Sequence, residues 1–320
     1  MATPNLTEAV TMTLRNRSKT LADNVSKGNA LLSRLNSRGK IRTVSGGREI
    51  LQELEHAENS SFLYYSGYEV LDITPAEVFS SAVFQWKQAA VAVSWSGLEA
   101  DIQNTGKEQI MNLVESRIAN AMRTMRNNLS TGIYSDGSGT AGKQVGGLQL
   151  LVADAPATGT VGGINRANHS FWRNQYYDFS SASVAASSTT IQAAMRALWI
   201  DCKRGSDHVD MWIGGDTYFE YFWNSLTTIQ RIERTDQGKA GFRNLMFVDA
   251  DVFHDGDSGL AATRMYALNT DFLYWRPHAN RNITTLDRRG SVNQDAGVVP
   301  IVWAGNLTVS NASLQGVMTA

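Results

Sequence analysis

The sequence predicts an α+β fold, and three stretches of it carry that prediction. Aromatic and β-branched residues in partial alternation between residues 43 and 98 are typical of strands. Apolar residues every three or four positions between 105 and 130 are typical of a long amphipathic helix. Residues 190–268 then alternate between helical and strand-like patterns. With 320 residues, of which 42% are hydrophobic, the chain is long enough for two or three structural units.

Composition excludes several classes of protein. The single cysteine, Cys202, excludes a disulfide framework and a cysteine-rich zinc site. No apolar run approaches the roughly 18 residues that a membrane span needs, and the first residues carry no signal-peptide core. We therefore expect a soluble protein that stays in a reducing compartment and does not contact a membrane.

Residues 1–42 are predicted to form an extended arm with short helical pieces, and this arm is basic. Residues 1–48 carry nine Lys and Arg against Glu8 and Asp23, a net charge of +7, whereas the rest of the chain sums to −8. A basic arm is typical of a segment that faces a polyanion or an acidic neighbour, although a solvated helical face gives the same count. The candidate contact residues are Arg15, Arg17, Lys19, Arg34, Arg38, Lys40 and Arg42.

Residues 43–98 are predicted to form an extended β-hairpin. Two arms of about 20 residues each, at about 3.3 Å per residue, would reach about 65 Å. A two-stranded ribbon of that length is marginal alone in water, so we expect it to lie on another subunit. Its large aromatics are candidate interface residues: Tyr65, Tyr68, Trp86 and Trp95.

The segment 99–135 contains the clearest single element, a helix over residues 105–130. Thr105 and Glu108 match a capping box, and the apolar residues that follow trace one helical face. At 1.5 Å per residue this rod is about 37 Å long, enough to brace a domain.

Residues 136–268 are predicted to form a Gly-rich connection and an α/β unit, and residues 269–320 a terminal β-segment. In the α/β unit we expect a helix with its inner face from Ile191 to Cys202, a strand at 209–213, and a helix capped by Asp216. Strand patterns follow at 245–253 and 264–274. In the tail, 298–302 and 307–314 read as two strands with a turn at Gly305 and Asn306.

Two glycine motifs resemble catalytic loops. The loop from Gly137 to Lys143 nearly completes a phosphate-binding loop, but a helix precedes it and Gln144 replaces the magnesium-binding hydroxyl. We expect a flexible loop there, and a nucleotide-binding enzyme is the less favoured alternative. The loop from Gly256 to Gly259 has the composition of a tight turn, and the five scattered histidines supply no recognisable base for a nucleophilic Ser258.

The acidic cluster at 249–257 misses the spacing of a calcium loop, and we expect no metal site there. Alternation places Asp249 and Asp251 on one strand face, which we expect to be solvated. Cys202, on an apolar helix face, is predicted to be a core residue. The sequence therefore predicts no catalytic, cofactor or metal residues.

The order of these parts resembles the major capsid proteins of tailed phages, which have the Hong Kong 97 fold, and those of short-tailed phages above all. The blocks that carry the resemblance are 44–52 (VSGGREILQ), 86–95 (WKQAAVAVSW), 132–139 (GIYSDGSG), 146–148 (GGL), 162–172 (GGINRANHSFW) and 303–317 (WAGNLTVSNASLQGV). They spread over nearly the whole chain, and their order is more specific than any one of them.

The resemblance implies an N-terminal arm, an extended loop that overlaps a neighbour, a spine helix in a peripheral domain, and an axial α/β domain, in a topology that some relatives permute. It implies a protein that is not an enzyme and that assembles through pentamers and hexamers into an icosahedral shell around double-stranded DNA. Portal, scaffold and cement proteins are the implied partners, the virion capsid the implied location, and the host cytoplasm the place of assembly. A bacterial nanocompartment shell of the same fold is the alternative. Lys87 and Asn306 are the residue types of a covalent crosslink, which we do not expect here.

Overall fold

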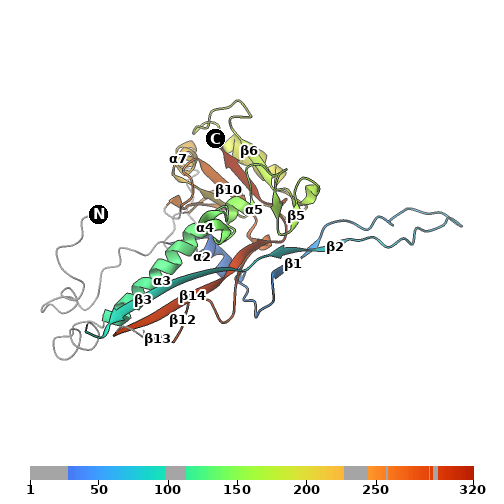
Figure 1. The fold of residues 1–320 in the computed structure, drawn as a ribbon. Helices are drawn as coiled ribbons and strands as arrows, with labels where there is room; N and C mark the ends of the chain where they lie inside the picture. Colours follow the sequence, from blue (N-terminus) through green and yellow to red (C-terminus); the bar gives the residue numbers. More distant parts are fainter. Residues whose placement is uncertain (1–27, 99–112, 227–243, 257–258, 288, 291–294) are drawn as a thin grey trace.

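The computed structural model describes residues 28–98, 113–226, 244–256, 259–287, 289–290 and 295–320. A compact α/β lobe sits on one end of a long, narrow sheet, and a hairpin projects away from both (Figure 1). The class is α+β, as predicted.

The long sheet is built around one central strand, β14 (Ala296–Val309). On one side β14 pairs antiparallel with β3 (Lys87–Ser96), from Ala296 opposite Ser96 to Gly305 opposite Lys87. On the other side it pairs with β11 (Leu273–Pro277), β12 (Thr284–Thr285) and β13 (Arg289–Gly290), also antiparallel. The prediction of two strands with a turn at Gly305 and Asn306 is wrong, because both residues pair with β11 and the strand runs on without a break.

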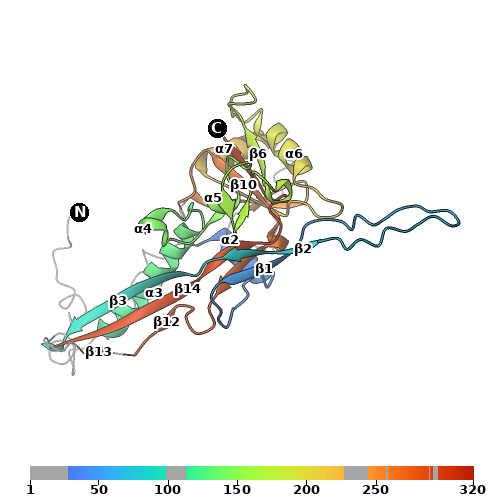
Figure 2. The same ribbon diagram turned by 45° about the vertical axis from the view of Figure 1, so that its right-hand side comes forward.

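The spine helix α3 (Leu113–Gly132) lies along the long sheet (Figure 2). Its buried apolar residues include Ala121, Met125 and Leu129, all on the predicted face. The helix is confirmed within the described residues and ends two residues later than predicted. The capping box at Thr105 and Glu108 lies outside the described residues.

The compact lobe contains a six-stranded sheet in the order β6-β15-β10-β7-β9-β8. Its strands are β6 (Gln175–Asp178), β7 (Met211–Gly214), β8 (Asn244–Phe247), β9 (Ala250–His254), β10 (Arg264–Leu268) and β15 (Gly316–Thr319). The predicted strand at 245–253 is two antiparallel strands, because Val248 adopts φ 59° and turns the chain between them. The predicted strand at 264–274 is likewise divided, by the 3₁₀ turn η5 (Thr270–Phe272).

Helices α6 (Ile191–Asp201) and α7 (Asp216–Ser225) pack against this sheet. The predicted inner face of α6 is confirmed, since Ile191, Ala194, Met195, Leu198 and Cys202 are all buried. The N-cap of α7 is Gly215 rather than Asp216, which occupies the first turn instead. An acidic residue there still interacts favourably with the helix dipole.

Short elements complete the subunit. They are α2 (Ala30–Ser37), α4 (Gly139–Gly142), α5 (Leu148–Leu151), η3 (Ser170–Trp172), and the paired strands β4 (Thr160–Val161) and β5 (Ile164–Asn165). Helix α2 is the described end of the arm. Asn29 caps it by accepting a hydrogen bond from the Leu32 amide at 2.8 Å.

The projecting hairpin has a short paired base and a long outer part that is not in paired strands. Its ladder consists of β1 (Ile50–Glu55) and β2 (Phe79–Phe84), which pair antiparallel over six residues each. Residues 56–78 continue outward without regular strands (Figure 1). The expected arms of about 20 paired residues are therefore not found, because the strand predicted at residues 91–95 belongs to β3 and pairs with β14.

Candidate assembly surfaces

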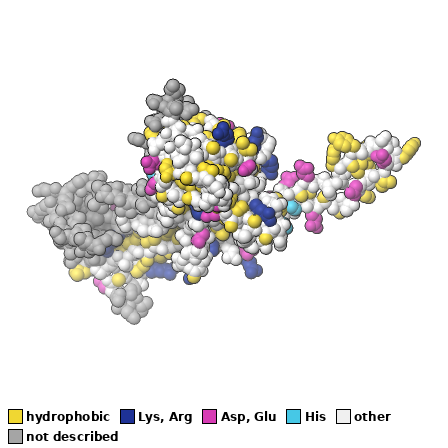
Figure 3. Space-filling view, turned by 90° about the horizontal axis from the view of Figure 1, so that it is seen from above, with side chains coloured by type: hydrophobic (Ala, Val, Ile, Leu, Met, Phe, Trp, Pro, Cys, Tyr) yellow, Lys and Arg dark blue, Asp and Glu magenta, His cyan; other side chains and the backbone are white. Residues whose placement is uncertain are grey.

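The outer part of the hairpin exposes large apolar side chains with no cover from the described part of the chain. Tyr68 is fully exposed, Tyr64 is 91% exposed and Tyr65 is 64% exposed. Their apolar neighbours on the same segment are Phe62, Leu63, Val70, Leu71, Ile73 and Phe79. Seen from above, these side chains gather toward the end of the projection (Figure 3). An apolar patch this concentrated is a candidate interaction site.

The four aromatics predicted for the interface divide into three environments. Tyr65 and Tyr68 lie on the exposed projection, as the prediction requires. Trp86 is half-buried at the foot of the hairpin, where its Nε1 donates to the Gly47 carbonyl at 3.0 Å. Trp95 is only 6% exposed and belongs to the core beneath the long sheet, so within the subunit it is a packing residue.

Three of the predicted polyanion-facing cations are neutralised within the subunit. Arg34 pairs with Asp251 at 3.2 Å and with Asp210 at 3.6 Å. Arg38 pairs with Asp210 at 2.9 Å, and Lys40 pairs with Asp271 at 3.1 Å. These pairs fasten α2 to the compact lobe and to the 3₁₀ turn before β11. Arg15, Arg17 and Lys19 lie outside the described residues, so for them the polyanion contact stays a prediction.

Two residues of the acidic cluster at 249–257, Asp251 and Asp255, are part of this attachment. Asp249 is exposed and pairs with His208 at 2.7 Å, whereas Asp251 is 2% exposed. The expectation of one solvated face is therefore wrong for Asp251. Strand β9 lies inside the sheet between β7 and β8, and its residues from Ala250 to Phe253 are all buried. A buried carboxylate requires a charged partner, and Arg34 of the arm provides it.

Asp255 joins three parts of the fold. Its Oδ2 accepts a hydrogen bond from the hydroxyl of Tyr134, just beyond α3, and one from the Ala30 amide at the start of α2 at 3.4 Å. Burial raises the pKa of Tyr134 well above its usual value, and the charge of Asp255 raises that pKa further. The phenol therefore remains a proton donor to Asp255 over the whole physiological range.

Three cations surround one tyrosine ring on β11. Lys40 Nζ lies 5.5 Å from the centroid of the Tyr274 ring, and the guanidinium carbons of Arg42 and Arg276 lie at 5.0 and 5.2 Å. We call these four residues the Tyr274 cluster. Arg42 was predicted as an anion contact, but nothing in the sequence placed it beside Arg276. Two isolated bridges, Ile41 with Trp275 and Val44 with His278, produce that alignment.

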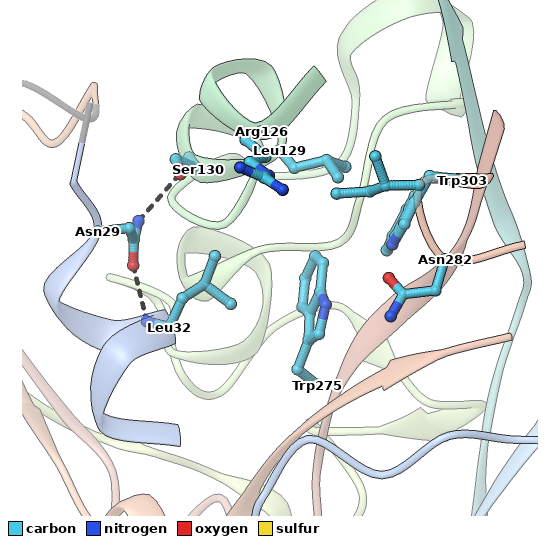
Figure 4. A pocket seen from close by; sticks show the side chains of 9 residues that line it. Asn29, Leu32, Arg126, Leu129, Ser130, Trp275, Asn282 and Trp303 are labelled. Atoms are coloured by element: carbon cyan, nitrogen blue, oxygen red, sulfur yellow. Dashed lines mark hydrogen bonds between the residues drawn. The ribbon is translucent and has the colours of Figure 1, made fainter. Parts of the chain in front are cut away.

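A cavity of about 220 Å³ lies between the arm helix, the spine helix and the long sheet (Figure 4). Trp275 and Trp303 form one wall, with their rings stacked at 5.1 Å and 21°. The Nε1 of Trp303 is buried without a hydrogen-bond partner among the described residues. Asn29 lies at the opposite side, where its Nδ2 donates to the Ser130 carbonyl at 3.4 Å. The cavity lies where the arm helix meets the spine helix and the long sheet, and Arg126 places a positive charge at one side of it.

The residues considered for chemistry occupy structural positions. The loop from Gly137 to Lys143 follows α3 and forms the short turn α4, in which Thr140 and Ala141 have positive φ, so it lacks the strand–loop–helix context of a phosphate site. Cys202 is buried, which raises the pKa of its thiol. Asp257 and Ser258 lie outside the described residues. In the part of the chain that is described, no three His, Cys, Asp or Glu side chains are grouped to hold a metal ion, and no helix could cross a bilayer.

Lys87 and Asn306 lie within one sheet of one subunit. Lys87 Nζ donates to the Gly142 carbonyl. Asn306 is 4% exposed, accepts from the Gly146 amide at 3.1 Å and donates to the Gln85 carbonyl at 3.0 Å. An amide held in this way links β14 to the loop that follows α4 and to the short segment between β2 and β3.

Comparisons with known proteins place this architecture. No protein-family model matches the sequence, and no curated protein matches it either. The structure is similar to that of the capsid of cyanophage A-1(L), with a TM-score of 0.71, 17% identity and 96% of both chains covered. It is also similar to the capsid of the Myoviridae phage XM1, with a TM-score of 0.58, 13% identity and 96% of both chains covered.

A bacterial shell protein shares the architecture as well. The encapsulin SrpI from Synechococcus elongatus gives a TM-score of 0.59 at 8% identity, with 94% of this chain and 91% of that chain covered. Folds similar to that of this chain over nearly its whole length thus occur in phage capsids and in an encapsulin complex from a bacterium. This chain has the Hong Kong 97-like fold of these shell proteins.

Proposed function

We propose that this protein is the major capsid protein of a tailed phage, which assembles with copies of itself into a closed icosahedral shell around double-stranded DNA. The observation that carries the proposal is the hairpin, on which nine large apolar side chains from Phe62 to Phe79 and Leu51 at its foot are exposed in the isolated subunit. Burying one such side chain is worth about 1.5–3 kcal/mol, so a neighbour that covers several of them gains a large driving force.

In this proposal the parts of the chain have the following roles. Residues 1–42 are the arm, 43–98 the extended loop that overlaps a neighbour, and 99–135 the spine segment of a peripheral domain. Residues 136–268 form the connection and the axial domain, and 269–320 complete the peripheral domain. Arg15, Arg17 and Lys19 face the packaged DNA or an acidic assembly partner. Pentamers and hexamers form from the same subunit, with portal, scaffold and cement proteins as further partners, during assembly in the host cytoplasm.

Electron microscopy of the purified recombinant protein tests the shell. We expect closed particles, and a monomer that stays monomeric at high concentration would contradict the proposal. Deleting residues 1–27 tests the arm separately, because the deletion leaves α2 and its ion pairs in place. We expect particles with less encapsulated DNA or a block in assembly, and particles with unchanged yield and DNA content would contradict a role for this part of the arm.

The similarity to SrpI favours a second candidate, a bacterial nanocompartment shell. The contents of the particles distinguish the two functions. Long double-stranded DNA inside particles made in the native host supports the phage capsid, whereas a co-purifying cargo protein in particles free of DNA supports the nanocompartment. Portal and terminase genes beside the gene for this protein would also support the phage capsid.

A further inference from the structure

The projecting hairpin is acidic throughout. Residues 50–85 contain six Asp and Glu and no Lys or Arg, although the whole chain is almost balanced. Four of the carboxylates lie beyond the paired strands, interleaved with the exposed aromatics: Glu58, Glu69, Asp72 and Glu77. A surface that combines apolar area with charge of one sign is best matched by a partner that offers aromatic area and cations.

These four carboxylates have no cationic partner among the described residues. Glu69 accepts a hydrogen bond from the Ser66 amide at 3.0 Å, and Asp72 accepts one from the Thr74 amide at 2.9 Å. Hydrogen bonds from Thr74 lower the pKa of Asp72, so its charge is present at any physiological pH. The hydrogen bonds from Ser66 and Thr74 come from uncharged groups, so they do not neutralise the carboxylates that accept them.

The Tyr274 cluster has the complementary property. Lys40 shares Asp271 with Arg38, but neither Arg42 nor Arg276 forms an ion pair with any described residue. Burial lowers the pKa of Arg276, and repulsion from Arg42 lowers it further. Arg276 Nη2 donates to Gln52 Oε1 at 2.6 Å, while its Nε is buried without a partner. Neither of these two guanidinium groups has a carboxylate at ion-pair distance among the described residues, although the charge of Glu53 raises the pKa of Arg276.

The same chain cannot bring these two surfaces together. The Tyr274 cluster lies at the foot of the hairpin, because Arg276 contacts Gln52 of β1. The outer carboxylates lie on the segment that extends away from this foot in both views (Figures 1 and 2). The outer carboxylates therefore cannot reach the cluster of their own chain, and one that binds it must come from another molecule.

We propose that the outer hairpin of one copy binds the Tyr274 cluster of a second copy, with Glu69 and Asp72 providing the carboxylates and Tyr68 the apolar contact. This inference rests on the proposed function and specifies its interface. Since the donor and receiver surfaces differ, the contact is head-to-tail, and such contacts form rings where the rotation from one copy to the next closes. Arginine suits the role because its planar guanidinium binds carboxylates through two parallel hydrogen bonds.

Charge reversal on both sides tests the pairing. The donor variant is Glu69→Lys with Asp72→Lys, the receiver variant is Arg42→Glu with Arg276→Glu, and the combined variant carries all four changes. Thermal melting of unassembled protein checks that each variant folds. Arg42→Glu alone serves as a second receiver variant, because Arg42 is exposed and its replacement disturbs the fold least. Arg204→Glu is the control, since Arg204 is an exposed arginine that pairs with the exposed Asp207 at 3.7 Å.

We expect the donor and receiver variants each to lower the yield of particles at least tenfold, the combined variant to recover most of the yield, and the control to match wild type. We also expect the wild-type yield to fall as salt screens the pairing. A folded receiver variant that assembles at wild-type yield, or a combined variant no better than either parent, overturns the pairing alone. Normal assembly with reduced DNA content also overturns it and assigns the cluster to DNA phosphates. Failure of the wild type to assemble overturns the proposed function itself.

Discussion

Tyr134 donates a hydrogen bond to Asp255, which links the end of the spine helix to the sheet of the compact lobe across 121 positions of sequence. The same carboxylate receives the Ala30 amide of the arm helix, so one buried residue connects arm, spine and lobe. The arm helix, the spine helix and the lobe are far apart in the sequence. Their relative placement in the subunit therefore depends on polar contacts as well as on apolar packing.

Replacing Tyr134 with Phe is expected to lower the free energy of unfolding by about 1–3 kcal/mol, because buried Asp255 loses a donor while the ring keeps its packing. Urea denaturation of the unassembled subunit measures the change. Tyr64→Phe is the matched control, since that hydroxyl is on an exposed side chain. Equal stability of the two variants would mean that the bond contributes nothing to the attachment.

Replacing Arg34 with Ala is expected to destabilise the subunit by about 3–5 kcal/mol. The reason is that the carboxylate of Asp251, which is only 2% exposed, then loses the cation that pairs with it. The control is Arg204→Ala, which breaks a solvent-exposed pair worth about 0–1 kcal/mol. Thermal or urea unfolding measures both. If the Arg34 variant loses DNA binding but no stability, the cation faces a polyanion after all.

Tyr68→Ala and Trp95→Ala are expected to have opposite effects. Removing the fully exposed Tyr68 ring should leave the stability of the subunit unchanged and reduce the yield of particles. Removing Trp95 should cost about 3–5 kcal/mol of subunit stability, because it empties a site in the core. Unfolding curves and sedimentation of assembly mixtures separate the two effects. A loss of subunit stability in the Tyr68 variant would show that the ring is already packed.

Acid is expected to loosen the attachment of the arm. Burial opposes ionisation of Asp271, but the hydrogen bond and charge of Lys40 and the charge of Arg38 outweigh it and lower the pKa below 3.8. A carboxyl with a lowered pKa stabilises the folded state above its unfolded value, and that contribution disappears as pH falls through the folded value. Cleavage within α2 by a protease that is active both in acid and at neutral pH should therefore accelerate below about pH 4. In Asp271→Asn the rate should be high at neutral pH and change less with acid.

Local patterns were enough to predict the elements whose partners lie nearby in sequence. The spacing of Ala121, Met125 and Leu129 identified the spine helix, and the inner face of α6 followed from the same rule. The exposure of Tyr65 and Tyr68 was also foreseeable, because no pattern nearby offered them cover. Their role in assembly remains a prediction.

Long-range pairing was not predictable in this way. The strand character of residues 91–95 was evident, but its partner β14 lies about 200 residues later, and only the register shows that Trp95 faces the core. Asp251 and Arg34 were misjudged for a related reason, since burial of both faces of β9 depends on its neighbours β7 and β8. A charge count over residues 50–85 would have revealed the acidic hairpin, but only the bridges beside β11 bring Arg42 to Arg276.

The one-signed charge of the hairpin has a consequence for molecules that meet before a shell exists. Two hairpins that approach tip to tip bring up to eight outer carboxylates together with no cation between them. Bare aromatic loops of neutral charge would adhere to each other and trap subunits in disordered clumps. Repulsion between identical tips makes this incorrect tip-to-tip contact unfavourable. The charge therefore selects against incorrect contacts between subunits before any correct contact has formed.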